Sequence, residues 1–215
     1  SQAVLNLRAF HGVSPNDLWA FGMFDEVHHW DGTDWSPVQT PVGANWMGAA
    51  GYTSFNLVGE GGAFLRWDNL NGAFFSLRDV EPSDVNELLG FADDDLWAVG
   101  NSGLVRHWDG AAWATSHLAP RPALRAITGA TATDLWASGD GRLYRWMGVG
   151  WQEYPTVPCS VFSMHALAAD DVWAVGALGC ALHWDGAGWT SRSTGLPMVT
   201  LRSVRARVER GVGRR

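Results

Sequence analysis

The heptapeptide HWDGAGW at residues 183–189 recurs almost unchanged as HWDGTDW at 29–35 and as HWDGAAW at 107–113. Each copy places two tryptophans on either side of an Asp-Gly pair. Asp-Gly between apolar residues is typical of a tight hairpin turn, because Gly tolerates positive φ and Asp accepts hydrogen bonds from nearby backbone amides. The three words therefore predict hairpins that carry tryptophan on both strands.

A second word, Asp-Leu/Val-Trp-Ala, precedes each hairpin. Its copies lie at residues 17–20, 95–98, 134–137 and 171–174, with a weaker copy at 55–58. If Leu57 replaces the tryptophan in the weak copy, successive steps are 38, 40, 39 and 37 residues. The tryptophans before the turns, at 30, 67, 108, 146 and 184, give steps of 37, 41, 38 and 38 residues. Five copies at one such period indicate a repeat protein.

Each copy divides into four short pieces that are rich in aromatic and branched residues and are separated by Gly, Asp, Asn and Pro, which is the strand pattern. Sustained helical periodicity is absent, so no substantial helix is expected. Sheets arranged in a ring bury the faces that a lone sheet leaves in water. We predict an all-β, five-bladed β-propeller of four-stranded antiparallel blades within one domain, residues 1–204. The predicted blades span residues 7–42, 45–82, 85–121, 124–158 and 161–197.

A sixth copy of the first-strand word, Leu201–Val204, follows the fifth blade. Either residues 199–204 form a closing strand that pairs with residues 3–6, or the chain is part of a longer propeller. The closed five-bladed ring is the favoured prediction. Residues 205–215 then form a basic C-terminal tail.

Composition narrows the expected partners. All 15 basic residues are arginine, and residues 1–200 hold nine of them against 21 acids, a net charge of about −12. Such a body repels phosphate, so nucleic acid is not an expected partner. No run approaches the ~18 apolar residues of a membrane span, so no transmembrane segment is expected. The 14 tryptophans carry too much apolar surface to stay in water. Most are predicted to lie between blades.

The combined pattern D-[LV]-W-A-x-G … [HR]-W-D-G-x-x-W resembles the short tryptophan-rich propeller repeats of bacterial secreted and cell-surface proteins. It is more distantly similar to tectonin-type lectin repeats and to the Asp-box hairpin of sialidase-like propellers. The resemblance covers residues 7–195. It implies a secreted or surface protein with a binding role. The Asp-to-aromatic spacing departs from the Asp-box, so that chemistry is not carried over.

The histidine or arginine before each turn tryptophan recurs once per blade, which would spread these side chains around a ring. Convergence on one metal ion is therefore not expected. We predict instead a structural contact with the aspartate of the second word: Asp17, Asp95, Asp134 or Asp171. Blade 2 lacks that aspartate, so Arg66 needs another partner. The recurring residues are His29, Arg66, His107, Arg145 and His183.

Catalytic and cofactor signatures are missing from the sequence. No nucleophile elbow, phosphate-binding loop or HExxH motif occurs, and the acidic runs lack the ligand spacing of a calcium loop. We therefore expect no cofactor and favour a binding protein over an enzyme, an alternative that turnover of a glycoside would revive. Cys159 and Cys180 both fall in the fifth blade, where they could form a disulfide or remain two thiols. A disulfide would favour an oxidising compartment.

A ligand of a propeller is expected where the loops between blades meet the loops joining second and third strands. We assigned the second residues of the first strands to this face: Arg8, Trp46, Asn86, Arg125 and Phe162. Neighbouring hairpins add Asp25, Glu26, Glu60, Asn101 and Asp140.

These residue types suit a sugar, with Trp46 as the stacking platform. Three interpretations remain open from the sequence. The first is a lectin-like, monomeric module that binds a glycan. The second is a scaffold for protein–protein interaction. In the third, the polar side chains merely fill the channel.

Overall fold

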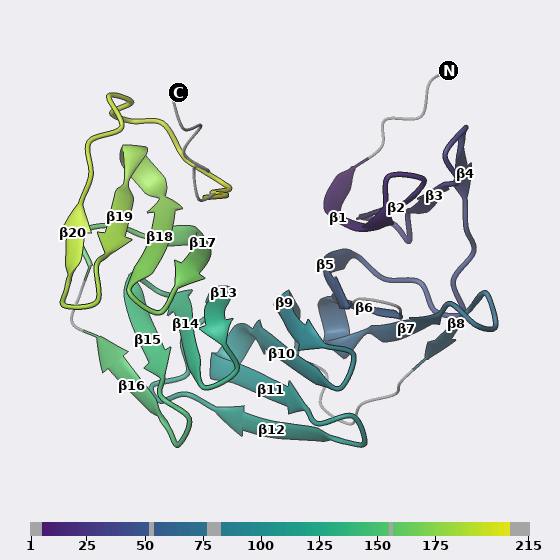
Figure 1. Cartoon of the computed structure of the whole chain (residues 1–215), viewed down its shortest axis with the longest axis horizontal. Helices are drawn as coiled ribbons and strands as arrows, with labels where there is room; N and C mark the ends of the chain where they lie inside the picture. Colours follow the sequence, from purple (N-terminus) through teal and green to yellow (C-terminus); the bar gives the residue numbers. More distant parts are fainter. Residues whose placement is uncertain (1–5, 52–53, 77–82, 155–156, 207–215) are drawn as a thin grey trace, which may run out of the picture. The chain divides into compact units, whose positions relative to one another are not determined.

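The chain folds as an all-β, five-bladed propeller (Figure 1), in a computed structural model that describes residues 6–51, 54–76, 83–154 and 157–206. Five sheets each contain four antiparallel strands, and neighbours in sequence are neighbours in the sheet. Helix in the described residues is limited to three short 3-10 turns. The chain divides into two compact units, residues 1–124 and 125–215.

The strands of the first unit are β1 (Leu7–Ser14), β2 (Asp17–Gly22), β3 (Val27–Trp30) and β4 (Trp35–Pro37) in blade 1; β5 (Trp46–Gly51), β6 (Phe55–Gly59), β7 (Phe64–Asp68) and β8 (Ala73–Ser76) in blade 2; and β9 (Val85–Ala92), β10 (Asp95–Gly100), β11 (Leu104–Trp108) and β12 (Trp113–His117) in blade 3. The later strands are β13 (Leu124–Thr131), β14 (Asp134–Gly139), β15 (Arg142–Trp146) and β16 (Trp151–Tyr154) in blade 4, and β17 (Val161–Ala168), β18 (Asp171–Gly176), β19 (Ala181–Trp184) and β20 (Trp189–Ser191) in blade 5. The 3-10 turns are η1 (Glu60–Gly62), η2 (Asn101–Gly103) and η3 (Ala177–Gly179).

The repeated tryptophan words form the outer hairpin of each blade. In blade 1, Trp30 on β3 lies directly opposite Trp35 on β4, with ring centroids 5.9 Å apart. The Asp31 carboxylate closes the turn by accepting hydrogen bonds from the backbone N–H groups of Thr33 (2.8 Å) and Asp34 (3.0 Å). Gly32 follows at φ 96°, where an L side chain would be strained. The repeated HWDGxxW sequence therefore forms a cross-strand pair of aromatic rings on either side of an Asx turn.

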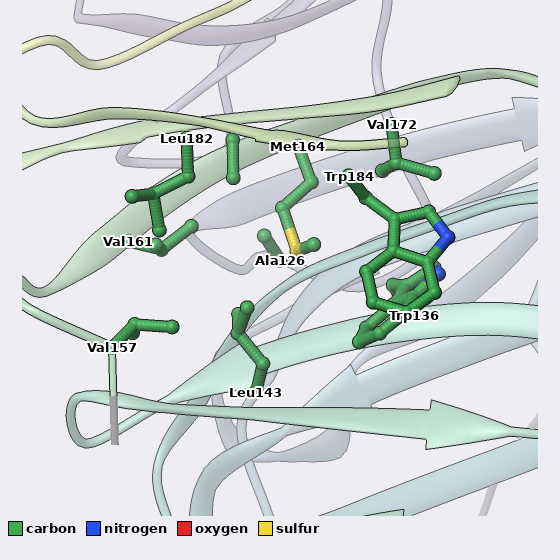
Figure 2. Packing of buried hydrophobic residues seen from close by; sticks show 10 residues of the cluster. Ala126, Trp136, Leu143, Val157, Val161, Met164, Val172, Leu182 and Trp184 are labelled. Carbon is green, nitrogen blue, oxygen red and sulfur yellow. The ribbon is translucent and has the colours of Figure 1, made fainter. Parts of the chain in front are cut away.

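Tryptophan also fills the core of each unit. In the second unit, the Trp136 and Trp184 rings lie 5.0 Å apart and pack with Val161, Met164 and Leu182 (Figure 2). Of the 14 tryptophans, all in the described ranges, only Trp35 is exposed. Five are buried and eight are partly buried, so nearly all of the indoles are at least partly removed from water.

The register of blade 2 corrects the alignment made from sequence. Asn56 lies opposite Arg66, just as Trp19 lies opposite His29 in blade 1. Asn56, not Leu57, therefore occupies the tryptophan position, and the repeat steps become 37, 41, 39 and 37 residues. The alignment was wrong because hydrophobicity alone favoured Leu57.

A close backbone approach explains the glycine that ends the second strand in blades 1, 2, 3 and 5. The N–H of Asn101, just after Gly100, donates to the Asp84 carbonyl (3.0 Å). A Cβ atom at Gly100 would collide with that same carbonyl oxygen. Glycine lets the β10–β11 loop lie directly against the incoming end of β9.

Residues 199–206 form no strand, which corrects the predicted closing strand at 199–204. They run along blade 5 and make isolated hydrogen bonds, from Leu201 N to the Gly176 carbonyl (2.9 Å) and from Val204 N to Ser163 Oγ (3.2 Å). These bonds to blade 5 take the place of a strand ladder. Of the expected partner segment, residues 3–5 lie outside the described residues, as do residues 207–215 of the basic tail.

Candidate functional site

The loops between second and third strands hold residues in the left-handed region. In blades 2, 3 and 5 the middle residue of the loop is Gly61 (φ 64°), Ser102 (φ 58°) or Leu178 (φ 55°), and the next residue is glycine. In blade 1 two successive positions are non-glycine, Phe24 (φ 57°) and Asp25 (φ 61°). A bulky residue with positive φ is a conformational outlier, and such strain concentrates at functional positions.

Phe24 stands at the edge of a groove between blades 1 and 2. The groove has a volume of about 520 Å³ and is lined by Phe24, Asp25, Asn45, Glu60 and residues 43, 44 and 61. The Phe24 side chain is 76% exposed. An aromatic ring thus projects into solvent beside two carboxylates and an amide.

Hydrogen bonds fix the walls of the groove. Asn45 accepts at Oδ1 from the Phe24 N–H (2.8 Å) and donates from Nδ2 to Glu60 Oε2 (2.6 Å). Asp25 Oδ1 accepts from Thr40 Oγ1 (2.5 Å) and from Trp46 Nε1 (3.2 Å). One amide side chain therefore ties the strained loop of blade 1 to the corresponding loop of blade 2. The site is preorganised by blade-to-blade contacts.

The same tie recurs at the next seam, where it carries no exposed aromatic residue. The Gly61 N–H donates to Asp84 Oδ1 (2.7 Å), as the Phe24 N–H donates to Asn45. The backbone contact is thus shared by these two seams and does not depend on the side chain of the loop residue. The Phe24 side chain is the specific addition.

Trp46, the stacking platform expected from the sequence, is fully buried at 0% exposure. It pairs with Gly59 as Leu7 pairs with Gly22, so it begins its strand and belongs to the core cluster that also contains Trp19. Its assignment to the second position was wrong because blade 2 was aligned one residue out of step. No ligand can stack on this indole unless the blade opens.

The predicted residues Asn86, Asn101 and Glu26 serve connections within the first unit. Asn86 Nδ2 donates to Asn101 Oδ1 (3.1 Å) and to the Leu124 carbonyl (2.7 Å). Asn101 Nδ2 donates to Asp84 Oδ2 (2.9 Å). Glu26 Oε2 accepts from the Asn6 N–H (2.9 Å). Their observed contacts join strands and loops.

The other predicted residues are more accessible and lie in separate places. Arg8 is exposed, and its Nη2 lies 3.3 Å from the sulfur of Met23. The Arg125 guanidinium lies 5.9 Å from the centre of the Phe162 ring. Asp140 is exposed in the short β14–β15 turn at φ 49°. Of the ten candidates, only Asp25 and Glu60 line the groove, and sequence reasoning missed Phe24 and Asn45.

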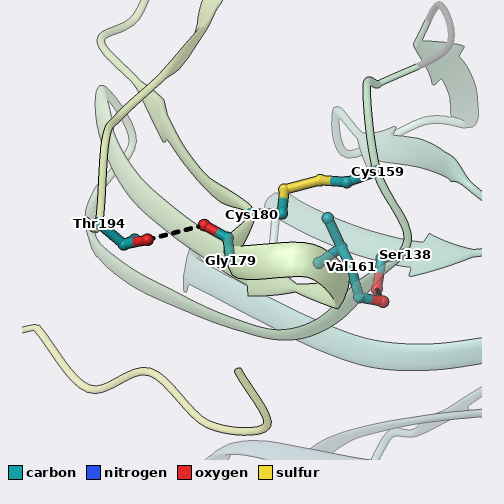
Figure 3. Close-up of a disulfide and its surroundings, with 6 residues drawn as sticks. All are labelled: Ser138, Cys159, Val161, Gly179, Cys180 and Thr194. Carbon is teal, nitrogen blue, oxygen red and sulfur yellow. Dashed lines mark hydrogen bonds between the residues drawn. A yellow bond between two sulfur atoms is a disulfide. The ribbon is translucent and has the colours of Figure 1, made fainter. Parts of the chain in front are cut away.

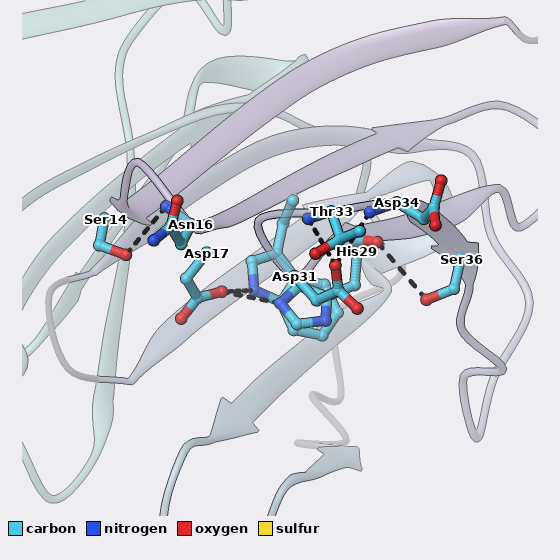
Figure 4. A network of polar contacts seen from close by, with 9 residues as sticks. Ser14, Asn16, Asp17, His29, Asp31, Thr33, Asp34 and Ser36 are labelled. Atoms are coloured by element: carbon cyan, nitrogen blue, oxygen red, sulfur yellow. Dashed lines mark hydrogen bonds and ion pairs between the residues drawn. The ribbon is translucent and has the colours of Figure 1, made fainter.

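A structural triad explains the recurring histidines and aspartates. In blade 1, Asp17 Oδ1 accepts from Trp19 Nε1 and lies 2.9 Å from His29 Nε2 (Figure 4). The His29 ring also stacks on Trp19, with centroids 4.2 Å apart. In blade 4, Arg145 replaces histidine and makes a two-bonded contact with Asp134 (2.8 and 2.9 Å). That contact raises the pKa of Arg145. The predicted structural pairing is confirmed in blades 1, 3, 4 and 5.

Backbone hydrogen bonds favour the charged form of the aspartates in the Asp-Gly turns. Hydrogen bonds from backbone N–H groups, first Asp34 and then Thr33, lower the pKa of Asp31. The same arrangement lowers the pKa of Asp109 and of Asp185. These carboxylates face their own turns, so they act as turn elements.

Cys159 and Cys180 form a disulfide at the loop end of blade 5 (Figure 3). It links the connector before β17 to the start of β19, across a Cα–Cα distance of 6.2 Å. Within the described ranges, no three His, Cys, Asp or Glu side chains gather where they could hold a metal ion. No helix in that part of the chain is long and apolar enough to cross a membrane.

Neither a protein-family model nor a curated protein matches the chain. Several solved propellers have a similar fold. A structure described as YCF48 bound to D1 peptide gives a TM-score of 0.72 at 13% identity, over 90% of this chain and 69% of that one. The WD40 β-propeller domain of Doa1 gives 0.71 at 12% identity, over 85% and 66%. YCF48 from Cyanidioschyzon merolae gives 0.60 at 11% identity, over 91% and 87%.

At these identities the likeness establishes the propeller fold alone. This chain spans about two thirds of the length of the first two structures. The relation to tectonin-type and Asp-box repeats stays a prediction.

Proposed function

We propose that this protein is a non-catalytic interaction scaffold that binds a peptide segment of a partner protein in the groove between blades 1 and 2. Phe24 carries the proposal. A phenylalanine held in the left-handed region and 76% exposed costs stability twice, through backbone strain and through exposed apolar surface. A partner that covers the ring removes its apolar surface from water and so offsets the cost of exposing it. Exposed aromatic anchors of this kind dominate the energetics of protein interfaces.

A peptide suits the groove better than a glycan. Sugar recognition relied on Trp46, which is buried, and on polar side chains that are engaged in contacts within the fold. The groove instead combines one accessible ring with the Asp25 and Glu60 carboxylates and the backbone at Gly43. The carboxylates are held by hydrogen bonds that fix the loops, which suits binding more than proton transfer. One propeller of similar fold is described with a bound peptide, which supports the class of ligand by analogy.

The disulfide supports an oxidising location, either secreted or at the cell surface, as part of this proposal. Reducing compartments keep most thiols unpaired. A protein that works there would gain little from Cys159 and Cys180.

The test compares the wild type with Phe24→Gly. A displayed library of random 12-residue peptides is selected on the immobilised full chain, and enriched peptides are synthesised and measured by fluorescence anisotropy. Glycine suits φ 57°, so the variant should unfold at equal or higher denaturant concentration. Its affinity for the selected peptides should fall about tenfold or more.

Leu178→Gly is the matched control, because Leu178 occupies the same loop position in blade 5. It should leave the affinity for these peptides unchanged. Equal binding by the wild type and Phe24→Gly would refute the proposed groove. If the selection enriched no peptide and a glycan array gave a specific signal, the proposed peptide ligand would be wrong and a sugar would take its place.

A further inference from the structure

Four large apolar side chains are exposed together at the loop end of blade 5. Leu178 is 68% exposed, Leu196 49%, Met198 82% and Val199 45%. A hydrogen bond from the Gly179 N–H to the Val199 carbonyl (2.5 Å) joins the loop that carries Leu178 to the segment 196–199, and the Val199 N–H closes a turn within that segment by donating to the Leu196 carbonyl (3.5 Å). We call these four residues the blade-5 patch. Apolar clusters of this kind on a soluble protein mark interaction sites.

Backbone conformation sets two members of the patch apart. Leu178 has φ 55° and Met198 has φ 68°. Both positions favour glycine or asparagine, because the side chain of an L-residue crowds its own backbone there. The fold thus holds two bulky apolar side chains outward at positions where glycine would cost less.

The patch is presented on a rigid base. The Cys159–Cys180 disulfide anchors the loop that carries Leu178. Thr194 Oγ1 donates to the Gly179 carbonyl (3.0 Å), and the two residues lie on facing segments in Figure 3. Thr194 Oγ1 also accepts from the Leu196 N–H (3.2 Å). A prearranged surface loses little conformational entropy when a partner binds.

A hollow of about 490 Å³ adjoins the patch. It is lined by residues 158–160, 177–181, 191 and 192, with the disulfide in its wall. None of these lining residues is acidic, and Arg192 is exposed at the rim. The hollow can accept an apolar side chain beside a positive charge.

The chain segment that contains Leu196, Met198 and Val199 has a charge opposite to that of the whole protein. The chain carries a net charge of −7, yet the stretch from Trp189 to Ala206 contains Arg192, Arg202 and Arg205 and no acid. All three arginines are exposed. A basic patch on an acidic protein attracts an acidic ligand and repels the basic ones that the rest of the surface attracts.

From these observations we propose that the blade-5 patch is a second docking surface, which binds an acidic peptide segment carrying aliphatic side chains. The aliphatic groups cover Leu178 and Met198 and enter the hollow, while the carboxylates meet Arg192, the one charged residue in its lining. This surface is separate from the blade 1–2 groove, which is lined by Asp25 and Glu60. The two surfaces therefore select ligands of opposite charge.

The test uses the full chain and a labelled 12-residue peptide of alternating leucine and glutamate, measured by fluorescence anisotropy at low and at high salt. Two comparison peptides replace every leucine with serine or every glutamate with lysine. The wild type should bind the Leu/Glu peptide at least about tenfold more tightly than either comparison peptide, and more weakly at high salt. Leu178→Gly combined with Met198→Gly should weaken that binding about tenfold. Arg192→Glu, an exposed change, should weaken it and reduce its salt dependence.

Phe24→Gly is the control that separates this proposal from the proposed function. It should bind the Leu/Glu peptide as the wild type does while losing affinity for the random-library peptides selected on the full chain. Undetectable binding of the Leu/Glu peptide by the wild type would overturn the proposal, as would equal binding by Arg192→Glu. A concentration-dependent dimer in sedimentation that the Leu178→Gly/Met198→Gly variant loses would overturn it in favour of a second copy as the occupant.

Discussion

Removal of the Cys159–Cys180 disulfide gives the sharpest stability prediction. The two cysteines are separated by 21 residues, and closing a loop of that length in the unfolded chain corresponds to about 3 kcal/mol. The double variant Cys159→Ala/Cys180→Ala should therefore lose about 3 kcal/mol of unfolding free energy. For a unit the size of residues 125–215, this lowers Tm on the order of 15 °C.

The measurement is thermal and urea unfolding followed by circular dichroism, with and without dithiothreitol. Reduction should bring the melting curve of the wild type close to that of the double variant, and should leave the double variant unchanged. A loss below about 1 kcal/mol would show that the cross-link does not constrain the unfolded chain as supposed. Two free thiols in the unreduced wild type would remove the premise altogether.

Three further predictions concern the repeat. Gly100→Ala should lower the midpoint of urea unfolding, because its Cβ would collide with the Asp84 carbonyl, whereas Ser102→Gly, two residues on, should not. Trp136→Ala should cost about 3–5 kcal/mol in unfolding free energy, read by calorimetry, because it empties a core position. The pKa of Asp109 and of Asp185 is lower in the folded protein than in the unfolded chain. The stability that these two carboxylates contribute is therefore present above their unfolded-state pKa, and it is lost as pH falls through the lower folded-state pKa. Urea midpoints should therefore drop below about pH 4, and Asp109→Asn/Asp185→Asn should flatten that drop; an unchanged slope would contradict it.

The fold could be predicted from the sequence because the same pattern of four short strands recurs five times. Each Asp-Gly turn and each tryptophan word carries its own local signal, and agreement between copies removes the ambiguity of any one. Blade 2 shows the limit of this approach. Ser54, Phe55 and Asn56 stand where other blades have Asp, Leu and Trp, so pattern matching slipped by one residue. A slip of one residue in a strand sends a side chain to the opposite face, and Trp46 was misplaced for that reason.

The groove and the blade-5 patch were harder to foresee. Turn chemistry predicts glycine, asparagine or aspartate at positive φ, so a phenylalanine or leucine in the loop gives no turn signal. Aligned loops did hold the clue, because Gly61 and Ser102 occupy the position of Phe24 and Leu178. Several polar side chains were predicted to bind a ligand but instead make hydrogen bonds within the fold. Asn86 and Asn101 satisfy backbone and amide partners inside the fold, which residue type alone does not reveal.

The left-handed loop position has a consequence for how such a protein can change. In blade 1 the loop is held there through the backbone N–H of Phe24, and blade 2 makes the same bond through Gly61, which has no side chain at all. Because the side chain takes no part in that bond, it can be exchanged without rebuilding the blade. The loops of blades 1 and 2 can then evolve, or be diversified in the laboratory, at this one residue each, and acquire new ligands while the strands around them stay constant.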